Sequence, residues 1–140
     1  MGGHNNAKSI LVIEDERPLM DVIVDKLTRE GFSVVSAKNG SQALDYMRNN
    51  IDVDAVWLDH YLFAHERGIN FVIELKANPA WRHIPVFVVS NSGNRRSKGE
   101  YLAHGATKYF VKVEKKLDEI VREIILSLME QPETVPDAAR

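Results

Sequence analysis

The chain has 140 residues, of which 44% are hydrophobic and 27% are charged, and its formal net charge is −2. This length suits one domain with one core and leaves no room for a second folded module, and the charge does not suggest a nucleic-acid binder. No apolar run approaches the roughly 18 residues of a membrane span, and the start lacks the apolar stretch of an export signal. We therefore expect a cytoplasmic protein without membrane contact. The absence of cysteine rules out disulfides and thiolate metal sites.

The first unit of the chain is a short apolar run followed by an amphipathic segment. Residues 9–13 (SILVI) predict a strand, and Pro18 then suits the first turn of a helix. Gly31 stands where the end of that helix is expected. The apolar residues of the segment fall on one helical face: Leu19, Met20, Ile23, Val24 and Leu27.

Two further units repeat this order. Residues 32–37 predict a second strand, and a helix with Ala43, Leu44 and Met47 follows it. Residues 53–58 are almost continuously apolar, which is typical of a parallel strand covered on both faces, and a helix follows Gly68.

The last two units differ in how clearly their helices are marked. Residues 86–89 and 109–111 are again buried-strand runs. Between them, residues 95–104 predict a weaker helix, interrupted by Gly99 and short of apolar residues, which we expect to be mobile. The final helix has a clear apolar stripe from residue 117 to 128. We expect one domain over 8–129 and a disordered tail over 130–140, and we assign residues 1–6 no function.

Alternation of five strands with five helices predicts an α/β fold with a parallel sheet covered on both faces. Ligands of such folds bind at the carboxyl ends of the strands. The residues at these ends are Glu14, Asp15, Asp59, Ser90 and Lys112. Each alone has an ordinary explanation as a helix cap or surface residue, but their joint placement indicates a site. Three carboxylates together repel one another unless a cation compensates them, and hard oxygen ligands favour Mg²⁺.

Four segments resemble the response-regulator receiver family over nearly all of residues 9–129. They are ILVIEDE, VWLDH, VFVVSNSG and GATKYFVK, which are similar to the family's acid pair, phosphoacceptor strand, switch-hydroxyl strand and aromatic-plus-lysine strand. The resemblance implies a flavodoxin-like, doubly wound sheet of order 2-1-3-4-5, an order that receivers themselves exemplify.

The resemblance also implies a role for each residue of the site. Asp59 would be the phosphoacceptor, with Asp15 a direct Mg²⁺ ligand, Glu14 a ligand through water and the backbone carbonyl of Tyr61 a further ligand. Phosphoryl transfer requires positioning and charge neutralisation, which the metal ion and a lysine supply.

The implied switch residues lie on the last two strands. Ser90 and Lys112 would contact the phosphoryl oxygens, and Tyr109 would turn inward when Ser90 moves toward the phosphoryl group. The implied partners are a sensor histidine kinase or phosphotransfer protein, and a downstream protein target that binds the last two helices and the strand between them. We expect a signalling domain and no enzyme beyond self-phosphorylation and autodephosphorylation.

The sequence departs from the family pattern in three respects. Val113 stands where proline is usual, so the cis peptide of that loop is expected to be missing. Phe63 also replaces a proline, in a loop that is one residue longer than usual. Tyr61 and Asn91 are larger than the residues usual beside the acceptor, which predicts restricted access of water.

Other functions fit the sequence less well. A haloacid-dehalogenase-type phosphatase needs a second acid at the position of Tyr61. An FMN site would need a phosphate loop where the acidic run 14–16 stands, and no glycine fingerprint for a nicotinamide cofactor is present. The histidines show no paired spacing for zinc. The remaining alternative is a receiver-shaped adaptor that acts without phosphorylation.

Overall fold

The computed structural model describes residues 7–49, 51–59, 68–91, 95–112 and 115–130. Five parallel strands form one sheet in the order β2-β1-β3-β4-β5. The strands are β1 (Ser9–Ile13), β2 (Ser33–Ala37), β3 (Ala55–Asp59), β4 (Val86–Ser90) and β5 (Lys108–Val111). The helices are α1 (Arg17–Arg29), α2 (Gly40–Arg48), α3 (Gly68–Ala77), α4 (Arg95–Ala103) and α5 (Leu117–Glu130). The predicted fold class, strand order and alternation of elements are confirmed.

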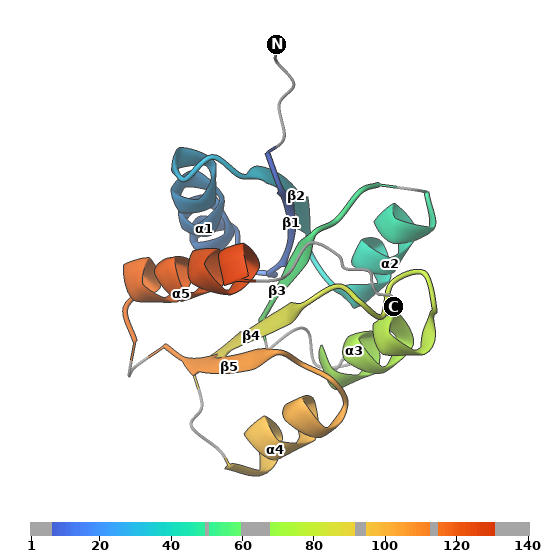
Figure 1. The fold of residues 1–140 in the computed structure, drawn as a ribbon. Coiled ribbons are helices and arrows are strands. Elements are labelled where there is room, and N and C mark those ends of the chain that lie inside the picture. Colours follow the sequence, from blue (N-terminus) through green and yellow to red (C-terminus); the bar gives the residue numbers. More distant parts are fainter. Residues whose placement is uncertain (1–6, 50, 60–67, 92–94, 113–114, 131–140) are drawn as a thin grey trace.

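Helices cover both faces of the sheet (Figure 1). Helices α1 and α5 pack on one face, and α2, α3 and α4 pack on the other. Because successive side chains of a strand point to opposite faces, each central strand contributes to two cores. In β3, Trp57 belongs to the core under α1 and α5, whereas Val56 and Leu58 belong to the other core. Continuous apolar runs are therefore what these buried strands require.

The register of the sheet brings the carboxyl ends of its strands to one edge. Ile13 of β1 pairs with Leu58 of β3, and Asp59 pairs with Val89 of β4. Ser90 then pairs with Val111 at the end of β5. Strand β1 lies between β2 and β3, so the chain reverses its direction of winding there. This edge is where ligands of doubly wound sheets bind.

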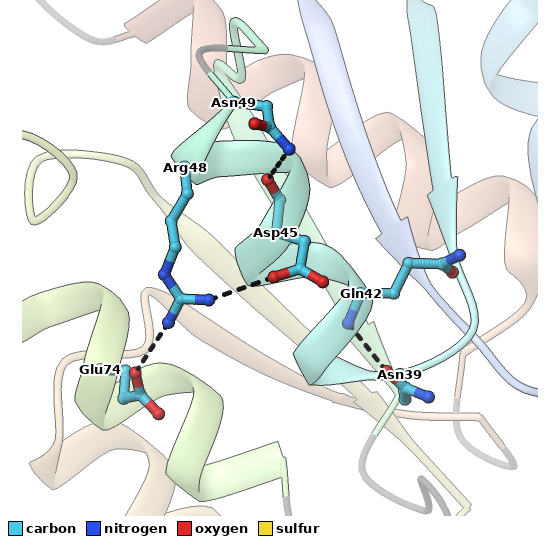
Figure 2. A network of polar contacts seen from close by, with 6 residues as sticks. All are labelled: Asn39, Gln42, Asp45, Arg48, Asn49 and Glu74. Atoms are coloured by element: carbon cyan, nitrogen blue, oxygen red, sulfur yellow. Dashed lines mark hydrogen bonds and ion pairs between the residues drawn. The ribbon is translucent and has the colours of Figure 1, made fainter.

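Helix α2 is held by local polar contacts (Figure 2). The Asn39 side chain caps it by accepting a hydrogen bond from the Gln42 backbone N–H at 2.9 Å. At the other end, Arg48 pairs with Asp45 at 3.2 Å and reaches Glu74 of α3 at 3.7 Å. Exposed ion pairs of this kind contribute about 1 kcal/mol or less each, so the Arg48–Glu74 pair helps to orient α2 against α3 more than it stabilises the fold.

Helix α4 differs from its prediction in one respect. It runs without a break through Gly99, and Tyr101 is its one buried residue. The expected mobility of this helix stays a prediction. Helix α5 extends to Glu130, one residue beyond the predicted limit of the domain.

Some sequence predictions lie outside the described residues. These concern the loop positions Tyr61 and Phe63, the peptide before Val113, and the tail 131–140. In the part of the chain that the structure describes, no helix is long and apolar enough to cross a membrane.

Candidate functional site

The structure places the five predicted site residues at the carboxyl edge of the sheet. Asp59 and Ser90 are the last residues of β3 and β4, and Lys112 directly follows β5. Glu14 and Asp15 follow β1, where the Glu14 backbone N–H donates to the Ala37 carbonyl at 3.0 Å. The hydrogen bonds of the sheet thus fix the backbone positions of these five residues.

Three carboxyl groups converge at this edge. Glu14, Asp15 and Asp59 each offer one oxygen, and these oxygens lie within 4.8 Å of one another. Glu14 is only 2% exposed and Asp59 only 5%, whereas Asp15 is half-buried. Oε2 of Glu14 accepts the backbone N–H of Glu16 at 3.2 Å. Its Oε1 is buried and has no hydrogen-bond partner among the described residues.

This crowding perturbs the pKa of Glu14. Burial, and secondly the adjacent Asp59 carboxyl group, raise the pKa of Glu14 to about 8. The Glu16 backbone N–H and the Lys112 ammonium act in the opposite direction but do not offset these effects. Glu14 therefore holds a proton at neutral pH unless a positive charge joins the cluster.

Lys112 supplies the cation nearest to Asp59 among the contacts in the described structure. Its Nζ lies 3.9 Å from Oδ2 of Asp59, and its side chain is about four-fifths buried. The Lys112 backbone N–H donates to the Ser90 carbonyl at 2.8 Å, which ties the two residues across the ends of β4 and β5. Ser90 is fully buried. A tetrahedral anion bound to Asp59 would meet a lysine on one side and the acid cluster on the other.

The residues present fit a divalent cation. All donors are oxygens, which suits Mg²⁺ and not a thiolate- or imidazole-seeking metal. Among the described residues Oε1 of Glu14 has no hydrogen-bond partner, and burial raises the pKa of its carboxyl group; a bound cation would offset both effects. A groove of about 680 Å³ between α1 and α2 is lined in part by Glu14 and Asp15. Mg²⁺ keeps several waters, and the half-buried Asp15 leaves room for them.

Tyr109 is buried at 8% exposure, and its ring packs on Tyr101 of α4 with 5.9 Å between centroids and 45° between planes. Sequence reasoning singled out Tyr109 but gave Tyr101 no role. The available signal was that Tyr101 is the one large aromatic side chain in a segment with few apolar residues.

Comparison with known proteins gives the family and the fold. Residues 10–125 match the family model of the response regulator receiver domain. The phosphate regulon transcriptional regulatory protein PhoB of Escherichia coli (strain K12) is 31% identical over 106 residues, which cover 76% of this chain. The chain spans 45% of the length of that curated relative.

Two solved structures show how far the likeness extends. The crystal structure of the phosphorylated cyanobacterial phytochrome response regulator RcpA has a TM-score of 0.78 at 25% identity, and the match covers 94% of this chain and 99% of RcpA. The Mn(2+)-bound form of response regulator Rcp1 has a TM-score of 0.76 at 22% identity, with 92% of this chain and 99% of Rcp1 covered.

Proposed function

Because the chain belongs to the response regulator receiver family, we propose that it accepts a phosphoryl group on Asp59 in a Mg²⁺-dependent reaction. The donor is a sensor histidine kinase or a phosphotransfer protein, the partners with which receivers of this family interact. The observation that carries the proposal is the environment of the Asp59 carboxyl group, which is 5% exposed, shares its cluster with Glu14 and Asp15, and faces Lys112 at 3.9 Å.

The reaction requires little covalent chemistry from the protein. The phosphorus–nitrogen bond of a phosphohistidine breaks as a phosphorus–oxygen bond forms at Asp59, and the histidine keeps the electron pair of the broken bond. The product is an acyl phosphate. Asp15 and Glu14 would hold the metal ion, which would neutralise charge on the phosphoryl oxygens. Lys112 and Ser90 lie at the two neighbouring strand ends and would contact the same oxygens.

We place the output on the face of α4, β5 and α5. A groove of about 230 Å³ opens there, lined by Lys98, Tyr109, Phe110, Val111 and Lys115. Tyr109 belongs both to this groove and to the core beneath α4. A change in its position therefore alters the surface that a protein target meets.

Phosphorylation of the isolated chain tests the proposal. With Mg²⁺ and acetyl phosphate, we expect a mass gain of one phosphoryl group, mapped to Asp59. Asp59→Asn should abolish the gain, whereas the exposed Asp52, at the opposite edge of the sheet, serves as the matched control in Asp52→Asn. Modification of another residue contradicts the assignment of Asp59. If no donor modifies the chain, the proposal fails, and the alternative is an adaptor that acts without phosphorylation.

A further inference from the structure

Helix α4 is anchored to the described structure through one buried side chain. Tyr101 is 2% exposed, and every other residue of α4 is exposed or half-buried. A helix of this kind gets its packing energy from that single contact region, because exposed polar residues contribute little burial. What Tyr101 contacts therefore decides where α4 lies.

The ring of Tyr101 contacts the ring of Tyr109. Its centroid lies 5.9 Å from that of Tyr109, in a tilted arrangement. Aromatic pairs of this geometry gain free energy beyond the burial of their area. Both rings belong to the same core, beneath α4 and α3.

The hydroxyl end of Tyr101 lies against Gly68, the first residue of α3. A Cβ atom at Gly68 would overlap the Tyr101 hydroxyl oxygen and would lie 3.4 Å from both Tyr101 Cζ and Leu58 Cδ2. The φ of Gly68 is not in the left-handed region, so glycine is required there for space and not for backbone conformation. Leu58 immediately precedes Asp59. Tyr101 and Leu58 thus both border Gly68, and Tyr101 shares one core with Leu58 and Tyr109.

We propose that Tyr101 is a positioning residue for the switch. Its ring holds Tyr109 in the buried position, and its hydroxyl end, seated on Gly68, couples that position to the start of α3 and to Leu58. Packed interiors have discrete arrangements, so a side chain that fits between two elements moves them together. The coupling to the acceptor rests on the proposed function; the positioning of Tyr109 does not.

The first test follows Tyr109 directly. In protein labelled with fluorotyrosine, the ¹⁹F resonance of Tyr109, assigned through Tyr109→Phe, reports burial through its shift between H₂O and D₂O. We expect a buried signal in the wild type, an exposed or broadened signal in Tyr101→Ala, and no change in Leu102→Ala, which removes an exposed apolar side chain of the same helix. A buried Tyr109 signal in Tyr101→Ala overturns the proposal.

The second test uses the contact at Gly68 and does not depend on a cavity. Gly68→Ala should disturb the Tyr109 resonance, and Tyr101→Phe in the same chain should restore it, because the overlapping hydroxyl oxygen is then gone. Gly99→Ala is the matched control, since a Cβ there meets nothing within 4 Å. An undisturbed Tyr109 in Gly68→Ala, or failure of Tyr101→Phe to restore it, contradicts the coupling through Tyr101.

The third test extends the coupling to the acceptor. Beryllofluoride with Mg²⁺ mimics a phosphoryl group, and coupling is reciprocal. We expect Tyr101→Ala to bind it about fivefold or more weakly than the wild type, and Leu102→Ala to bind it equally. If the wild type itself binds no beryllofluoride, the proposed function fails. If the wild type and Tyr101→Ala bind it equally, the coupling fails while the proposed function stands.

Discussion

Burial of Glu14 beside Asp59 makes the metal-free protein sensitive to pH. The pKa of Glu14 is raised from its ordinary value of 4.5 to about 8, so the folded chain holds this proton more tightly than the unfolded chain. Between these two values the unfolded state loses the proton first. The contribution of Glu14 to stability therefore falls as pH rises through this window.

Glu14→Gln tests this effect, because glutamine cannot ionise. At pH 8 and without metal, we expect the free energy of unfolding of Glu14→Gln to exceed that of the wild type by about 4 kcal/mol, and the difference to vanish near pH 4.5. Urea unfolding in EDTA at several pH values measures it. The exposed Glu16 is the control position, in Glu16→Gln. A difference independent of pH would show that the charge of Glu14 is not its cause.

At the scale of single elements, we expect α4 to be stabilised by a substitution at Gly99, where an added side chain has no neighbouring atoms within 4 Å. Gly99 lies inside the helix, and a Cβ there would meet open space. Gly99→Ala should raise the free energy of unfolding by about 0.5–1 kcal/mol, because alanine loses less conformational entropy on forming a helix. Thermal denaturation followed by circular dichroism should show a Tm about 1–4 °C higher.

The contrasting glycine is Gly105. Its φ of +111° lies in the left-handed region, and a Cβ there would come within 3.1 Å of the Lys76 side chain. Gly105→Ala should therefore destabilise the fold, whatever the helix propensity of alanine. Equal effects of the two substitutions would mean that the backbone conformation at Gly105 does not constrain the residue type.

The strands could be predicted from the sequence more readily than the contacts between elements. The runs that became β1, β3 and β4 were predictable because a strand buried on both faces must be apolar throughout. Contacts between elements were not predictable. Lys76 would be taken for a surface residue, yet its Nζ donates to the carbonyls of Arg82 at 3.0 Å and Ile84 at 2.6 Å, and burial lowers its pKa. The contact of Tyr101 with Gly68 likewise depends on how α3 and α4 pack, which no local pattern states.

At the scale of the whole molecule, metal binding and folding are linked. A ligand that binds only the folded state raises the free energy of unfolding of the whole domain, by about 2.7 kcal/mol at a ligand concentration of 100 times its Kd. We expect the Tm to rise with Mg²⁺ concentration, to return on addition of EDTA, and to respond much less in Asp15→Asn. Asp52→Asn should respond like the wild type, since its side chain lies away from the cluster. An equal response in Asp15→Asn would remove Asp15 from the metal site.

The candidate site followed from topology more than from any single residue. A parallel sheet brings the ends of its strands together, so the positions after each apolar run already indicated where Glu14, Asp59 and Lys112 would meet. The sequence could not show the hydrogen bonding or the pKa shifts of these side chains. The unpartnered Oε1 of Glu14 and the direction of its pKa shift depend on burial, which is set by the packing of all five units.

The single anchor of α4 also bears on how this receiver can change over evolutionary time. Seven of its nine residues are exposed, and substitutions at exposed positions usually alter the free energy of unfolding by less than about 0.5 kcal/mol. As long as Tyr101 keeps its place, the charge and shape of the outer side of α4 can drift without cost to the core. A gene duplicate could thus acquire a new interaction specificity through this helix while the carboxyl edge of the sheet, with its proposed phosphorylation site, stays under purifying selection.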